Sequence, residues 1–170
     1  MSSPGSRCLA LPAEADTLAF GAAAADALPG DDAPFVVYLE GDLGAGKTCL
    51  ARALLQRLGV TGRIHSPSYG LMAQYEAAGW QVLHLDLYRL EDPAELALLG
   101  IRDLHAGRSL WLVEWPERGA GELPAPDLRL RLAFDADGAH TACLEPCSPR
   151  GQAWCDRLEL MNLRQAADIS

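Results

Sequence analysis

The segment that most constrains the fold of this chain is rich in glycine and spans residues 41–48, GDLGAGKT. An apolar run, residues 35–39, comes before it and predicts a buried strand that ends at Glu40. After it, residues 49–58 carry apolar side chains at helical spacing, and Gly59 is placed to end that helix. The order therefore predicts a strand, a phosphate-binding loop and a helix.

The residues of this loop suit a polyphosphate. Glycines let successive backbone N–H groups turn inward and form an anion-binding nest at a helix N-terminus. We expect Lys47 to reach the β- and γ-phosphates and the Thr48 hydroxyl to ligate Mg²⁺. Lys47 is the only lysine among 14 basic residues, so the one compact ammonium group stands where a phosphate needs it. The predicted nucleotide contacts of the loop are Leu43, Gly44, Ala45, Gly46, Lys47 and Thr48.

Composition narrows the classes of protein. The 170 residues are 49% hydrophobic and 22% charged, which is typical of one soluble globular domain. No apolar run approaches the length of about 18 residues that a membrane span needs, and no signal peptide is recognisable, so we expect a cytoplasmic protein without membrane contact. The net charge of -9 argues against a free-standing nucleic-acid binder. Any contact with RNA is expected to need a partner.

The cysteines predict neither a disulfide framework nor a zinc site. There are five of them, an odd number, and no two form a Cys-x-x-Cys pair. We therefore expect them to be small core or surface residues.

Periodicity and turn residues predict the remaining elements of a single domain, residues 1–170. We expect residues 1–7 to be frayed, and Asp92 to cap a short helix that Gly100 ends. An antiparallel hairpin is expected from residue 128 to 144, with a turn at Asp137 and Gly138. The other expected elements are strands over 8–11, 68–76, 80–88 and 109–114 and helices over 13–28 and 150–167.

Two of the predicted central strands end in a carboxylate, at Asp86 and at Glu114. In a parallel α/β sheet a ligand binds beyond the carboxyl ends of the strands, so both acids are expected to face Lys47 and Thr48. One acid could hold the magnesium shell while the other orients an attacking water. The alternative for each acid is a helix cap or a surface position.

Several other polar residues have two interpretations. Ser66 and Ser68 lie where nucleotide-sensing switch loops are common, but they could also bond their own backbone in a turn. His84 stands in a predicted apolar strand, which favours a core residue over a ligand. Arg89 or Arg118 could place a cation on the transferring phosphate, but an arginine beside an acid more often forms a surface ion pair, which we expect for both.

Four motifs together resemble the TsaE (YjeE) family in order and spacing. They are residues 41–48 (GDLGAGKT), 66–69 (SPSY), 84–90 (HLDLYRL) and 114–118 (EWPER). The resemblance runs from about residue 11 to about residue 144, and the second pair of motifs is more specific than the loop.

The resemblance implies a P-loop ATPase that acts with the TsaB–TsaD pair in the threonylcarbamoyl modification of adenosine 37 in tRNA. Its implied fold is α/β: a three-layer P-loop NTPase sandwich with a central, mostly parallel sheet and an antiparallel C-terminal hairpin at its edge. The implied cofactors are ATP and Mg²⁺, and tRNA is contacted only indirectly through the complex.

The resemblance also implies roles for individual residues. Thr48 and Glu114 would hold Mg²⁺, and Lys47, Asp86 and Glu114 would act in hydrolysis. The further nucleotide contacts would be Pro12, Thr17, Ser66, Ser68, Trp115 and Glu117. Ser68 departs from the threonine usual in the family, as do Gly70 and Cys49 at positions where threonine is common.

Two alternatives keep the same loop. A small nucleoside or nucleotide kinase also pairs an acid with an arginine after a strand, but no arginine-rich lid segment is present. A nucleotide-gated binding module would use its ATP-bound state, and not turnover, as the output.

Overall fold

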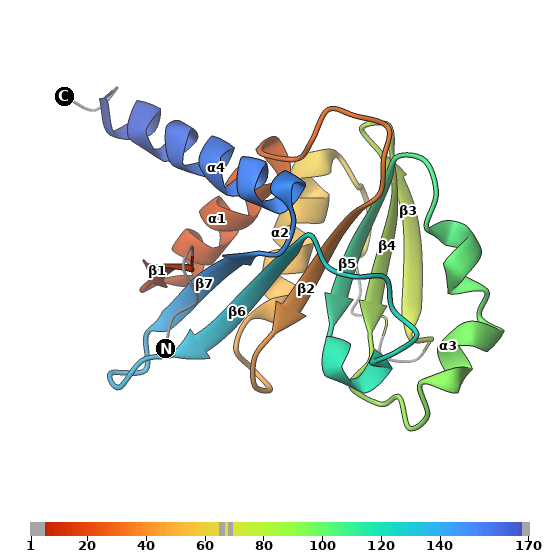
Figure 1. Ribbon diagram of the computed structural model, residues 1–170. Helices are drawn as coiled ribbons and strands as arrows, with labels where there is room; N and C mark the ends of the chain where they lie inside the picture. The colour runs from red at the N-terminus through yellow and green to blue at the C-terminus, as the bar shows by residue number, and fades with distance from the viewer. Residues whose placement is uncertain (1–5, 65–66, 68–69, 168–170) are drawn as a thin grey trace.

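The computed structural model describes residues 6–64, 67 and 70–167 (Figure 1). Its α-helices are α1 (Glu14–Asp26), α2 (Lys47–Leu58), α3 (Ala94–Leu98) and α4 (Pro149–Ala167). Two short 3-10 helices are η1 (Ile101–Leu104) and η2 (Pro116–Gly119). The strands are β1 (Arg7–Leu11), β2 (Phe35–Glu40), β3 (Met72–Ala77), β4 (Trp80–Asp86), β5 (Ser109–Glu114), β6 (Leu128–Phe134) and β7 (His140–Pro146). None of the described helices is long and apolar enough to cross a membrane.

The described strands form one sheet in the order β1-β7-β6-β2-β5-β4-β3. Strands β6, β2, β5 and β4 are mutually parallel, whereas the pairs β1–β7, β7–β6 and β4–β3 are antiparallel. The expectation of a mostly parallel sheet is therefore wrong, because the sheet mixes parallel and antiparallel pairs of strands. The reason is local: two hairpins reverse the chain, one of them through Ala78 and Gly79, which both have positive φ as a two-residue hairpin turn requires.

The β6–β7 hairpin forms as predicted, but it does not lie at the edge of the sheet. β1 pairs with the outer side of β7, from Arg7 opposite Leu144 to Leu11 opposite His140. This pairing covers backbone groups of β7 that would otherwise form an open edge. The edge strand at this end of the sheet is thus β1, the N-terminal strand.

Helices cover both faces of the sheet (Figure 1). Val37 and Leu39 of β2 point to the face where α1, α2 and α4 pack, and Val36 and Tyr38 point to the face of α3 and η1. The strand is buried on both faces, which explains why its sequence is a continuous apolar run. These layers hold β2 rigidly, and β2 carries the glycine-rich loop at its end.

The C-terminal helix packs onto α1. Trp154 and Leu158 are buried and Met161 packs against the same core, so the apolar stripe that the sequence predicts does face inward. The indole Nε1 of Trp154 donates a hydrogen bond to the carbonyl oxygen of Ala24, 3.0 Å away. α4 thereby joins the end of the chain to its first helix.

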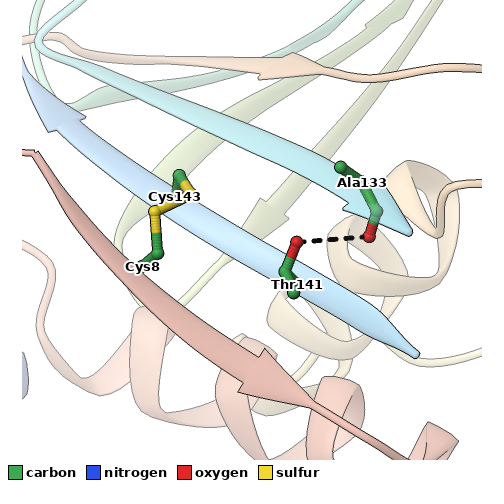
Figure 2. The surroundings of a disulfide bond; sticks show 4 residues. All are labelled: Cys8, Ala133, Thr141 and Cys143. Atoms are coloured by element: carbon green, nitrogen blue, oxygen red, sulfur yellow. Dashed lines mark hydrogen bonds between the residues drawn. A yellow bond between two sulfur atoms is a disulfide. The ribbon is translucent and has the colours of Figure 1, made fainter. Parts of the chain in front are cut away.

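Cys8 of β1 and Cys143 of β7 form a disulfide, which corrects the expectation that no cysteine pairs (Figure 2). The register of the two strands places them directly opposite each other. Counting cysteines and looking for short spacings could not find this pair, because its members are 135 residues apart. Cys49, Cys147 and Cys155 are free thiols.

Candidate functional site

The glycine-rich segment connects β2 to α2, and its backbone requires glycine. Gly46 precedes the first residue of α2 in the left-handed conformation, with a φ of 99°. Gly41 has a φ of 142°, and a Cβ atom there would lie 2.2 Å from the carbonyl oxygen of Leu132 in β6. The first turn of a helix leaves N–H groups without intrahelical partners. The loop therefore brings backbone donors and the positive end of the α2 dipole to one place, as an anion site needs.

Lys47 folds back over this loop. Its ammonium Nζ donates hydrogen bonds to the carbonyl oxygens of Gly41, at 2.6 Å, and Asp42, at 2.8 Å. It also lies 4.2 Å from the centre of the Trp115 ring. Burial lowers the pKa of Lys47, and the nearby carboxylate of Glu114 opposes this shift. A positive charge is thus held in the loop with its donors directed at neutral oxygens, which a phosphate could replace.

The two carboxylates meet at the carboxyl ends of neighbouring parallel strands. Asp86 of β4 is opposite Glu114 of β5 in the register. Both are buried, and Asp86 accepts a hydrogen bond from the backbone N–H of Tyr88 at 3.1 Å. The Thr48 hydroxyl donates to the Glu114 carboxylate, with oxygens at 2.9 and 3.1 Å. The sequence-predicted magnesium ligands therefore touch each other.

This donor set fits Mg²⁺ bound together with a phosphate. Among the described residues, no group of three or more His, Cys, Asp or Glu side chains could enclose a metal ion. Mg²⁺ keeps several waters and takes one or two protein oxygens plus phosphate oxygens. A hydroxyl and a carboxylate beside an anion-binding loop are what such a site requires.

One cavity of about 410 Å³ brings most of the predicted residues together. Its lining includes all of the following sequence-predicted residues: Leu43, Gly44, Gly46, Lys47, Thr48, Asp86, Glu114 and Trp115. Three lining residues were not predicted as site residues, namely Cys49, Tyr88 and Arg89. The signal for Tyr88 and Arg89 was their place two and three residues after Asp86, the last residue of β4 and itself part of the cavity lining.

A second cavity of about 390 Å³ lies on the other side of the loop. Pro12 and Thr17, at the start of α1, line it together with Gly44 and Gly46. His140, which the sequence did not indicate, also lines it and places Nδ1 3.1 Å from the carbonyl oxygen of Ala45. The pairing of β7 with β6 and β1 brings His140 to this position.

Ser66 and Ser68 lie outside the described residues. Ala45 and Glu117, the remaining predicted residues, line neither cavity. The side chain of Ala45 is buried within the loop. Glu117 is exposed on η2, yet it is close enough to raise the pKa of Lys47 by its charge.

Trp115 adopts an unusual backbone conformation at the cavity wall. Its φ is 57°, in the left-handed region that non-glycine residues seldom occupy. Its ring centre lies 5.0 Å from that of Tyr88, and the Lys47 ammonium lies over its face. Conformations of this kind persist where the surroundings determine them, often at functional sites. Here the result is an indole held beside the charged end of Lys47.

His84 is buried, as the sequence predicts, but it is more than a core residue. Its side chain is fully inaccessible, and Nε2 lies 2.7 Å from Oε1 of Glu114. The spacing of two residues from His84 to Asp86 places both on one face of β4. Their shared face could have indicated a common role.

Fold and site define an α/β protein in which a glycine-rich loop, the start of a helix and two strand-end carboxylates border one cavity. The chain belongs to the TsaE family: the family model described as "Threonylcarbamoyl adenosine biosynthesis protein TsaE" matches residues 11–142. Family members are named for tRNA threonylcarbamoyladenosine biosynthesis.

Two similar relatives bear the name tRNA threonylcarbamoyladenosine biosynthesis protein TsaE. That of Haemophilus influenzae is 48% identical over 102 residues, which cover 60% of this chain and 65% of the relative. That of Bacillus subtilis is 33% identical over 135 residues, which cover 79% of this chain and 82% of the relative. The crystal structure of Bacillus subtilis YdiB has the same fold, with a TM-score of 0.75 over 95% of this chain and 99% of that one at 22% identity.

Proposed function

We propose that this chain is a Mg²⁺-dependent P-loop ATPase of the three-layer NTPase type that serves tRNA threonylcarbamoyladenosine biosynthesis. The observation that carries the proposal is the meeting of Lys47, Thr48, Asp86 and Glu114 in one cavity at the N-terminus of α2. Family membership supports the biosynthetic assignment.

Each residue has a chemical task in this proposal. The Lys47 ammonium and the N–H groups of the loop bind the β- and γ-phosphates, and Trp115 limits the access of water beside them. Thr48 and Glu114 hold Mg²⁺, which when bound neutralises charge on the phosphates. Asp86 is buried at the carboxyl end of the neighbouring strand β4, where its carboxylate could accept a proton from a water and orient its lone pair toward the γ-phosphate.

The second cavity suits the nucleoside. Pro12 and Thr17 form its wall next to Gly44 and Gly46, so a nucleotide with its phosphates in the loop would place its base there. ATP is preferred over GTP in this proposal because the chain has no Asn/Thr-Lys-x-Asp motif of the kind that reads guanine. Its single lysine is already in the loop.

The output of hydrolysis is proposed to be a switch on a TsaB–TsaD complex in the cytoplasm. A chain of net charge -9 has little affinity of its own for RNA, so tRNA would be reached only through the complex. Ser66 and Ser68 are proposed to sense the γ-phosphate when the partner is bound. Turnover by the chain alone is then slow and rises when the partner is added.

Lys47→Ala tests the nucleotide site. We expect the variant to lose ATP binding in isothermal titration calorimetry while its far-UV circular dichroism stays unchanged, because a phosphate-facing charge has been removed. Arg52→Ala is the control, since Arg52 is an exposed basic residue on the same helix. Wild-type affinity for ATP in Lys47→Ala would disprove the proposed site.

The switch is tested by steady-state ATP hydrolysis with and without a TsaB–TsaD pair. We expect slow turnover alone and stimulation of several-fold with the pair. Fast turnover of the isolated chain, at tens per second, would contradict the switch and favour a self-sufficient enzyme.

A further inference from the structure

The contact between His84 and Glu114 takes a defined direction if Glu114 is a metal ligand. A carboxylate that binds Mg²⁺ can only accept hydrogen bonds, so the hydrogen between Oε1 of Glu114 and Nε2 of His84 would then belong to the imidazole. In the neutral ring Nδ1 is then unprotonated, and it is a buried atom without a hydrogen-bond partner among the described residues. The single N–H group of the neutral ring thus donates to Glu114.

The position of His84 follows from the strand register. His84 is opposite Leu112, and Asp86 is opposite Glu114, so His84 and Glu114 are diagonal neighbours on one face. That face is the one covered by α2, because Leu112 belongs to the core beneath α2. His84 therefore lies on the face of the sheet that α2 covers, next to Glu114, which lines the cavity.

Glu114 is held from two sides as a consequence. Oε1 receives Nε2 of His84 at 2.7 Å and the Thr48 hydroxyl at 3.1 Å, while Oε2 receives only the Thr48 hydroxyl, at 2.9 Å, among the described contacts. The shortest of these bonds anchors Oε1 to the sheet. Oε2 is then the oxygen better placed to serve a ligand in the cavity.

We propose that His84 is a positioning residue that orients the Glu114 carboxylate for Mg²⁺ and so sets the Mg²⁺ affinity of the nucleotide site. This inference rests on the proposed function, because it presumes that Glu114 binds Mg²⁺ in the presence of a nucleotide. Partners of this kind, which hold a metal ligand in place, change metal affinity by about 10–100-fold when they are removed.

Two amide substitutions separate positioning from core packing. The amide nitrogen of His84→Gln can take the place of Nε2 and keep a donor for Glu114, whereas that of His84→Asn reaches only the place of Nδ1. Both variants put a neutral amide into the same buried site, and the shorter His84→Asn leaves more of that site unfilled than His84→Gln does. Thermal melts of both variants report any loss of stability.

The measurement is the Mg²⁺ concentration that half-saturates binding of the non-hydrolysable analogue β,γ-imido-ATP, followed by isothermal titration calorimetry. We expect His84→Asn to raise it by about tenfold or more, and His84→Gln to remain close to wild type. Nucleotide affinity in EDTA should stay the same in all three proteins. An unchanged Mg²⁺ requirement in His84→Asn, or an equal rise in both variants, would overturn the inference while leaving the proposed function intact.

Wild-type protein provides the remaining tests. If it binds the analogue without any dependence on Mg²⁺, the proposed function fails and the inference fails with it. If either variant does not fold, ¹⁵N NMR of the wild-type imidazole decides: a hydrogen on Nε2 and a bare Nδ1 support the inference, and the opposite tautomer overturns it.

Discussion

At the scale of single residues, Asp86 and Glu114 occupy equivalent ends of neighbouring strands but have different surroundings. The Glu114 carboxylate accepts a hydrogen bond from the Thr48 hydroxyl and lies 2.7 Å from Nε2 of His84. The Asp86 carboxylate accepts a hydrogen bond from the backbone N–H of Tyr88. The carboxylate that touches the hydroxyl beside the loop suits a metal, and the other suits a water. Substitution of Glu114 and substitution of Asp86 should therefore impair different functions, metal binding and hydrolysis respectively.

Matched amide substitutions test this division. We expect Glu114→Gln to weaken Mg²⁺-dependent nucleotide binding, because an amide is a poorer ligand than a carboxylate for a hard cation. Asp86→Asn should leave binding nearly intact and slow hydrolysis by about 10²-fold or more, the scale of a lost acid–base group. Calorimetry with β,γ-imido-ATP and single-turnover hydrolysis measure the two effects. Equal losses of binding in both variants would refute the division.

The sequence was sufficient to propose Asp86 and Glu114, because each follows an apolar run that predicts a central strand. It could not reveal the bond from His84 to Glu114. That bond joins residues 30 positions apart and depends on how β4 and β5 are aligned. The same limit applies to His140, which reaches the loop through the pairing of β7 with β6 and β1.

At the scale of elements, the helix that follows the loop is held against α1 by close backbone approach. A Cβ atom at Gly21 of α1 would lie 2.5 Å from Cβ of Ala53 and 3.1 Å from the carbonyl oxygen of Leu50, both in α2. Gly21 has no side chain, so the two helices pack at a distance that any larger residue would prevent. The position of α2, and with it that of Lys47 and Thr48, depends on this contact.

We expect Gly21→Ala to destabilise the protein by about 1–3 kcal/mol, the usual effect of overpacking, despite alanine's better helix propensity. Ala53→Gly removes one of the clashing atoms at a cost of about 1 kcal/mol in propensity. In urea unfolding the double variant should lose less stability than the two single variants together. Strict additivity would show that the helices do not meet at these residues.

The bounds of single helices and strands were predicted more reliably than the pairing of the strands. Strand β5 has the predicted bounds, residues 109–114, because a short apolar run bounded by polar residues is a strong local signal. The mixed sheet and the edge position of β1 were not predicted, since periodicity describes one segment and not its pairing. A five-residue strand such as β1 carries no information about which strand it will join.

At the scale of the whole molecule, the disulfide between Cys8 and Cys143 closes almost the entire chain into one loop. β1 lies near the N-terminus, β7 lies just before α4, and the two cysteines are 135 residues apart. Within the described residues, β1 pairs with β7 alone, so the bond joins the edge strand to its one sheet neighbour (Figure 2). The same edge leads into Pro12, which lines the second cavity.

Reduction of this bond should therefore destabilise the fold without abolishing it, because the β1 ladder and the apolar core remain. A disulfide that closes a long loop stabilises by about 2–5 kcal/mol through the entropy of the unfolded chain. For a domain of this size that corresponds to a fall in Tm of roughly 5–15 °C. Dithiothreitol should produce this fall in the wild type and in Cys147→Ser, whose altered thiol is exposed, but not in Cys143→Ser.

Disulfides are uncommon in cytosolic proteins, so the state of the bond also bears on the proposed location. Five titratable thiols in the unfolded, unreduced protein instead of three, or a Tm indifferent to dithiothreitol, would show that the two strands are held together by the ladder alone.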